Sequence, residues 1–198
     1  MMDRPRLVMI AGSNGAGKST ITAQFRQDAS FPINYINPDE IILTNAEIIA
    51  IADPVERVYA AAREGDRQRQ VLLQARESMA FETVMSHPSK IDFAIAAREA
   101  GYEVLLIFVG VASAEISLQR VIERVANGGH DVPRQKVIDR YQRVMALLPQ
   151  AIQAVSRALL FDNSDDRSGA RLVAEFINGQ VVSRADDLPQ WAIQSILF

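Results

Sequence analysis

The chain lacks cysteine altogether, and it has only two histidines, His87 and His130. Disulfide bonds and thiolate metal sites are therefore excluded, and a zinc site is not expected, because proteins hold zinc mainly through cysteine and histidine. Long apolar runs are also lacking, since the longest, Val104 to Ala112, is far too short to cross a bilayer. A net charge of −3 indicates neither a nucleic-acid partner nor a membrane partner.

The composition is otherwise ordinary, with 48% apolar and 23% charged residues among 198 positions. This length favours a single domain, residues 1–198, with enough material for a core. Asp3, Arg4 and Arg6 lead directly into an apolar run, so no signal peptide is expected and we predict a cytoplasmic protein.

One segment indicates a specific chemistry. Residues 12–19 read Gly-Ser-Asn-Gly-Ala-Gly-Lys-Ser and fit the phosphate-binding pattern G-x-x-x-x-G-K-[ST] at every fixed position. Its glycines let the backbone aim N–H groups at a phosphate, and a helix beginning near Lys18 adds the positive end of its dipole. Lys18 can reach the β- and γ-phosphates, and the Ser19 hydroxyl can ligate Mg²⁺. The residues predicted to bind a nucleoside triphosphate are Gly12, Ser13, Asn14, Gly15, Ala16, Gly17, Lys18, Ser19 and Thr20.

Strand-like runs alternate with helical patterns along the chain, as in a parallel sheet covered by helices. The runs lie at 6–11, 33–36, 79–84, 102–110 and 157–162. Asp53-Pro54 predicts a helix to about Glu77 that is broken or loosened near Gly65-Asp66, and Pro133 predicts another helix to about Leu148. Turn signals favour an antiparallel hairpin over 170–184. We predict an α/β fold of the P-loop NTPase type, a mostly parallel sheet flanked by helices, with a helical lid and a small C-terminal hairpin.

Motifs typical of other P-loop proteins are missing. No Asn-Lys-x-Asp or Thr-Lys-x-Asp segment for reading guanine occurs. The run 104–110 has no acid at its end, and the strand-like run that does end in Asp, 157–162, lies far along the chain. Small-molecule kinases of the P-loop type often do without that acid, because phosphates and waters complete the Mg²⁺ shell. These absences favour a kinase over a GTPase or a motor ATPase.

The segment Asn37-Pro38-Asp39-Glu40 follows the strand-like run 33–36. In a parallel sheet the carboxyl ends of the strands face the ligand crevice, so a carboxylate here can accept the proton of an attacking hydroxyl. The alternative is that Asp39 or Asn37 only caps the helix that follows.

Glu82 and Thr83 lie near the end of the run 79–84. Because side chains alternate along a strand, one of the two can face the crevice and the other the flank. A glutamate in the crevice can accept hydrogen bonds from a polyhydroxyl substrate. The alternative is a strand end that faces solvent.

Basic side chains gather between residues 120 and 143, where six basic residues stand against three acidic ones. We predict a mobile lid at about 124–136 that brings arginines onto the transferring phosphoryl group, since this chemistry depends on positioning and charge stabilisation. The alternative is a solvated face of two helices. The candidate residues are Arg120, Arg124, His130, Arg134 and Arg140.

In their order along the chain these segments resemble the zeta toxins and their short relatives among P-loop kinases. The segments that carry the resemblance are Gly12–Thr20, Asn37–Asp39, Phe81–Thr83, 128–133 with Ile138–Tyr141, and Phe161–Ser164.

The resemblance implies an ATP- and Mg²⁺-dependent kinase that phosphorylates a sugar hydroxyl of a UDP-N-acetyl amino sugar. It implies that Asp39 is the base, that Arg120 or Arg124 binds the triphosphate, and that Glu82 and Thr83 face the sugar. It also makes an antitoxin protein a candidate partner.

The sequence departs from the long zeta toxins in the lid, where an arginine-containing segment is replaced by Gly-Gly-His-Asp-Val-Pro at 128–133. The second phosphate-binding residue therefore stays open among Arg134, Arg140 and His130.

Two other functions remain open. One is a kinase for a different hydroxyl metabolite, such as a free sugar or a nucleoside. The other is a nucleotide-dependent ATPase or switch module that acts through a protein partner.

Overall fold

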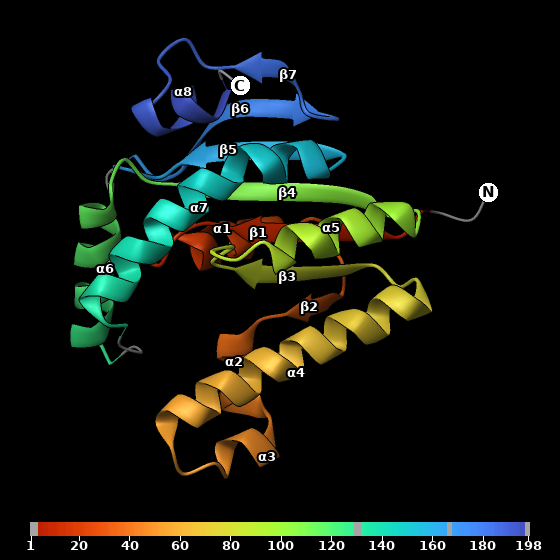
Figure 1. The fold of residues 1–198 in the computed structure, drawn as a ribbon, viewed down its shortest axis with the longest axis vertical. Helices are drawn as coiled ribbons and strands as arrows, with labels where there is room; N and C mark the ends of the chain where they lie inside the picture. Colours follow the sequence, from red (N-terminus) through yellow and green to blue (C-terminus); the bar gives the residue numbers. More distant parts are fainter. Residues whose placement is uncertain (1–3, 129–131, 166–167, 197–198) are drawn as a thin grey trace.

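A computed structural model describes residues 4–128, 132–165 and 168–196. Within these residues, strands form one sheet in the order β2-β3-β1-β4-β5-β6-β7. Strands β1 to β5 pair in parallel, whereas β6 and β7 add an antiparallel hairpin at one edge (Figure 1). The strands are β1 (Arg6–Ala11), β2 (Asn34–Ile36), β3 (Met79–Thr83), β4 (Glu103–Gly110), β5 (Arg157–Asp162), β6 (Arg171–Ile177) and β7 (Gln180–Arg184). The predicted α/β fold and the hairpin are confirmed.

Helices cover both faces of the sheet. They are α1 (Lys18–Phe25), α2 (Pro38–Thr44), α3 (Ala46–Ile49), α4 (Pro54–Ala75), α5 (Ser89–Glu99), α6 (Ala114–Ala126), α7 (Arg134–Ala154) and α8 (Gln190–Ile196). Alternation along β1 divides the core, because Leu7 and Met9 face the larger cluster with α4, α5, α7 and α8, whereas Val8 and Ile10 face the smaller cluster with α1.

The prediction of a break near Gly65 is wrong, because α4 is continuous from Pro54 to Ala75. Its start is as expected, since the Asp53 carboxylate accepts a hydrogen bond from the Val55 N–H at 2.7 Å. Gly65 is buried, and a Cβ placed on it would lie 3.5 Å from Ile36. A Cβ at that distance would make ordinary van der Waals contact, so the packing does not require a glycine, and the helix cost of the glycine, about 1 kcal/mol, is small beside the packing of the whole helix.

Helix α7 extends past the predicted end at Leu148 to Ala154, with Pro149 inside it. Leu148 just before the proline and Ala151 and Ile152 just after it are all buried. Burial of this apolar face offsets the local cost of the proline, which is why the helix does not end there.

Candidate active site

The loop between β1 and α1 has the backbone shape that phosphate binding requires. Gly15 and Gly17 have φ of 72° and 91°, a region that side chains disfavour. A Cβ on Gly12 would lie 2.3 Å from the carbonyl oxygen of Val109, so this glycine lets the loop approach β4. The Asn163 side-chain amide, just after β5, donates to the Ala16 carbonyl at 2.8 Å and holds the loop from the other side.

Lys18 lies in the first turn of α1 with its ammonium folded back onto the loop. Its Nζ donates to the carbonyl oxygens of Gly12 and Ser13 at 3.0 and 2.9 Å. Burial lowers the pKa of Lys18 to about 8, because desolvation disfavours the charged form. The ammonium is thus held by weak neutral acceptors that a phosphate can replace.

Charges around Lys18 show which groups converge on it. Glu82 and Asp39 raise its pKa, and both are acids that the sequence predicted for the site. Arg124 and Arg140 lower it, so two of the predicted lid arginines also lie within electrostatic reach of this ammonium. The structure therefore brings the loop lysine, two candidate acids and two candidate arginines to one place.

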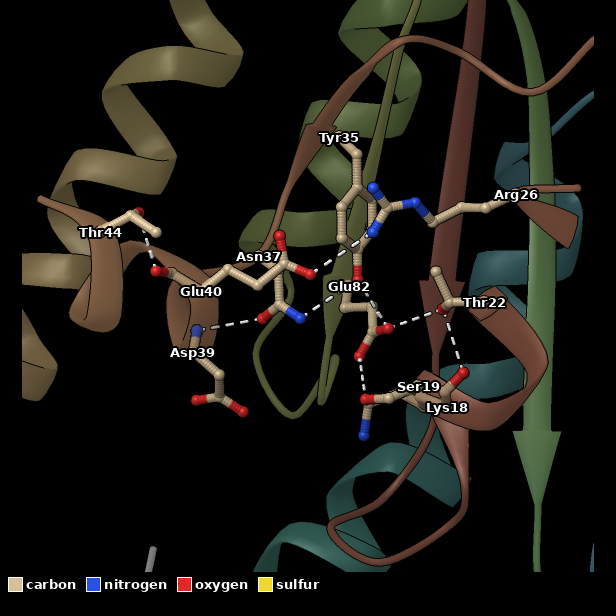
Figure 2. Close-up of polar contacts among 10 residues, drawn as sticks. All are labelled: Lys18, Ser19, Thr22, Arg26, Tyr35, Asn37, Asp39, Glu40, Thr44 and Glu82. Carbon is tan, nitrogen blue, oxygen red and sulfur yellow. Dashed lines mark hydrogen bonds and ion pairs between the residues drawn. The ribbon is translucent and has the colours of Figure 1, made fainter. Parts of the chain in front are cut away.

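Glu82 is buried between α1 and β2 rather than facing solvent, with only 8% of its surface exposed. Its carboxylate accepts hydrogen bonds from Ser19 Oγ at 3.1 Å, Thr22 Oγ1 at 2.6 Å and Tyr35 OH at 2.7 Å (Figure 2). Burial and the Glu82 charge raise the pKa of Tyr35, so the phenol stays protonated and donates. In this structure the carboxylate is held by protein donors and lies beside the predicted Mg²⁺ ligand, Ser19.

Glu82 supplies beside the phosphate loop the acid that the end of the run 104–110 lacks. Strand β3 pairs directly with β1, so the acid near its end lies next to the phosphate loop. The signal was the apolar run Met79-Ala80-Phe81 followed by Glu82. Sequence alone does not tell which strand neighbours β1, and β4, whose end carries no acid, is an equally good candidate by sequence.

The residues beside the loop suit Mg²⁺. A serine hydroxyl and a carboxylate that lie 3.1 Å apart are hard oxygen ligands, which Mg²⁺ prefers. Among the described residues no three or more histidine, cysteine or acidic side chains are placed so that they could hold a metal ion together. Mg²⁺ commonly binds through one or two protein oxygens together with substrate phosphates, so the donor set present here is sufficient.

Asp39 and the helix cap are separate residues. The Asn37 side-chain oxygen accepts a hydrogen bond from the Asp39 N–H at 3.0 Å and caps α2, while its amide donates to Tyr35 OH at 3.1 Å (Figure 2). Asp39 lies in the first turn of α2, and its side chain is exposed on the cavity that Lys18 also lines. The capping alternative therefore applies to Asn37, and the Asp39 carboxylate lies where an acceptor can reach it.

The predicted lid residues differ in their positions. Arg120 of α6 donates to the Gly15 carbonyl at 3.4 Å, and Arg140 of α7 donates to the Asn14 side chain at 3.3 Å. Arg124 also lines the cavity. Arg134 is exposed at the start of α7, near Glu115, whose pKa is lowered mainly by a hydrogen bond with Ser113 and to a smaller extent by the charge of Arg134. His130 lies outside the described residues, and whether the segment moves as a lid stays a prediction.

These groups share a cavity of about 740 Å³, which is within the usual range for small-molecule sites. Its apolar lining includes Val58, Tyr59 and Val84. The polar residues that line it are Asn14, Lys18, Ser19, Thr20, Asn37, Asp39, Asp66, Arg69, Glu82, Thr83, Lys90, Arg120, Arg124, Lys136 and Arg140. Thr83 also lines the cavity, and its hydroxyl accepts a hydrogen bond from the Met85 N–H at 3.1 Å.

No helix within the described part of the chain is both long and apolar enough to span a membrane.

Comparisons with known proteins agree on one family. The model of the zeta toxin family matches residues 1–172. An uncharacterised protein of Haemophilus influenzae is 30% identical over 137 residues, which cover 69% of this chain and 92% of that protein.

Solved structures share the fold. The complex of AvrRxo1-ORF1 with AvrRxo1-ORF2 and sulphate ions has a TM-score of 0.71 at 20% identity, covering 98% of this chain and 65% of that one. A structure of the same complex with ATP has a TM-score of 0.70 at 22% identity, covering 93% and 62%. A structure from the PezAT toxin–antitoxin system of Streptococcus pneumoniae has a TM-score of 0.64 at 16% identity, covering 99% and 79%. The chain thus spans less than two thirds of the AvrRxo1-ORF1 chain.

Proposed function

This chain belongs to the zeta toxin family, and from that premise we propose that it is an ATP- and Mg²⁺-dependent kinase that phosphorylates a hydroxyl group of a small molecule. The observation that carries the proposal is the shared cavity, in which Lys18 of the phosphate loop and Asp39 of α2 lie within electrostatic reach of each other. A donor site and a candidate base thus converge on one space.

The donor half of the site follows from the loop geometry. The backbone N–H groups of the loop and the N-terminus of α1 would hold the β- and γ-phosphates, and Lys18 would turn from the loop carbonyls to the phosphate oxygens. Ser19 and Glu82 would hold Mg²⁺, which when bound neutralises charge on the phosphates. The structure of the AvrRxo1 complex with ATP supports ATP as the donor.

The acceptor half depends on Asp39. Its carboxylate takes the proton of the acceptor hydroxyl while that oxygen bonds to the γ-phosphorus, and the bond from the γ-phosphorus to the bridging oxygen breaks to release ADP. Arg120, Arg124 and Arg140 would stabilise the charge on the γ-phosphoryl group, since two of them already contact the loop. Family membership supports a UDP-N-acetyl amino sugar as the acceptor.

A protein partner of the antitoxin kind is part of the proposal. Two structural neighbours come from two-component assemblies, AvrRxo1-ORF1 with ORF2 and the PezAT toxin–antitoxin system. A partner that covered this cavity would block both the donor and the acceptor halves.

A substrate panel tests the proposal. Purified protein is incubated with ATP, Mg²⁺ and one candidate acceptor at a time, taken from UDP-sugars, free sugars and nucleosides. The mass of each product is then measured by mass spectrometry. We expect ATP consumption to be slow until a UDP-N-acetyl amino sugar is added, which then gains one phosphoryl group. If a free sugar or a nucleoside gains the phosphoryl group instead, that compound and not the UDP-N-acetyl amino sugar is the acceptor. Rapid ATP hydrolysis with no acceptor would favour an ATPase module.

A further inference from the structure

Two basic side chains that the proposed reaction does not use line the same cavity. Arg69 lies on α4 and Lys90 in the first turn of α5, and both share its wall with Lys18 and Asp39. We call Arg69 and Lys90 the basic pair. They meet at one carboxylate, because the Asp66 side chain forms ion pairs with both, at 2.7 Å in the case of Lys90 Nζ.

Arg69 is held in place from two sides. Only 4% of its surface is exposed, and its guanidinium lies over the ring of Phe81 at 4.6 Å and near that of Phe93 at 5.9 Å. An arginine fixed against aromatic rings loses little entropy when it binds a ligand, and its planar fork suits oxyanions.

The positive charge of the basic pair is only partly neutralised by Asp66. Burial lowers the pKa of Arg69 to about 10 and that of Lys90 to about 8, and the charge of Arg69 is the second cause for Lys90. Among the described residues Asp66 is the carboxylate that forms ion pairs with both cations, and its side chain is 56% exposed, so water weakens its effect. An added anion would stabilise both cations in their charged forms.

We propose that the basic pair binds a phosphate group that the acceptor itself carries. The UDP-N-acetyl amino sugar proposed above carries such a group, whereas a free sugar or a nucleoside does not. This inference rests on the proposed kinase function, and it assigns the acceptor's anionic group to Arg69 and Lys90, while its hydroxyl lies at Asp39.

The site can be tested without knowing the acceptor. The donor half is first filled with Mg²⁺ and the non-hydrolysable analogue AMP-PNP, and inorganic phosphate is then titrated and followed by calorimetry. We expect wild type to bind one phosphate and Lys90→Gln to bind it about tenfold more weakly, as befits the loss of a charge-assisted hydrogen bond. Arg67→Gln is the matched control, because Arg67 lies on the same helix but pairs with Glu64 at the surface.

Asp66→Asn separates binding from a structural role. Removing this carboxylate leaves the basic pair without its protein counter-charge, so we expect phosphate to bind several-fold more tightly. If the three side chains only stabilised the packing of α4 on α5, Lys90→Gln and Asp66→Asn would change phosphate binding in the same direction or not at all. Either result, or no phosphate binding by wild type, overturns the inference.

Transfer assays keep the two proposals apart. ATP-dependent mass gain is compared for N-acetylglucosamine, N-acetylglucosamine 1-phosphate and UDP-N-acetylglucosamine. We expect the two phosphate-bearing compounds to be preferred over the neutral sugar, and the preference to fall about tenfold in Lys90→Gln. Equal transfer to all three would overturn the phosphate site and leave the kinase function standing. Phosphate binding as expected with no transfer to any hydroxyl compound would overturn the kinase function, and with it the assignment of the phosphate to an acceptor, while the phosphate site at the basic pair would stand.

Discussion

ATP should bind more weakly as the pH rises above about 8, because the triphosphate needs Lys18 in its charged form. In the free protein burial lowers the pKa of this ammonium to about 8. Bound phosphates would raise that pKa again, so binding takes up a proton wherever the free lysine is neutral. The second ionisation of a phosphate lies near pH 6, so the charge on ATP is constant in this range.

The magnitude follows from the fraction of protonated Lys18. Below pH 8 the affinity should be nearly level, and above it should fall tenfold for each pH unit. At pH 9 only about one molecule in ten carries the charged lysine, which weakens binding about tenfold, or by about 1.4 kcal/mol. Calorimetry at several pH values gives the affinity, and repeating it in buffers of different ionisation enthalpy gives the proton uptake.

Two variants make this test specific. Lys18→Arg should bind ATP with no such slope, because arginine stays charged throughout the range. Lys90→Gln should keep the slope, although burial also lowers the pKa of Lys90 to about 8. A level affinity from pH 7 to above 9 in wild type, or a slope retained in Lys18→Arg, would refute the reasoning.

Further predictions concern two glycines and Glu82. Gly12→Ala should abolish ATP binding, because its Cβ would lie 2.3 Å from a carbonyl oxygen of β4. Gly65→Ala should raise the free energy of unfolding, measured in urea, by about 0.5–1 kcal/mol, because the nearest neighbours of its Cβ would lie at 3.5 Å or beyond. Equal effects of the two substitutions would contradict this account of the loop. Glu82→Gln should raise the Mg²⁺ concentration for half-maximal ATP turnover about tenfold, and an unchanged Mg²⁺ titration would remove Glu82 from the metal site.

The sequence predicted features that depend on neighbours along the chain. The phosphate loop, the strand before it and the hairpin turn at Asn178-Gly179 each follow from residue types at fixed spacing, and in that turn both residues have positive φ. The helix start at Asp53 is equally local. Such features can be read from a short window because the backbone geometry and its side-chain partners lie within it.

Other features depend on contacts between distant segments. Glu82 lies beside Ser19 only because β3 pairs with β1, and the sequence of neither strand predicts that pairing. Gly65 indicates a break in isolation but lies inside a helix that packs closely on β2. Lys90 meets Asp66 across two helices, and no motif marked either residue. In each case tertiary packing decides the role of the side chain.

The central claim is that Asp39 is the base of a phosphoryl transfer. The most direct measurement compares ATP affinity and the rate of transfer for wild type and Asp39→Asn, using the acceptor that gains mass in the substrate panel. We expect Asp39→Asn to bind ATP as wild type does and to lose transfer by a factor of about 10²–10⁴. Near-normal transfer by Asp39→Asn would contradict the account.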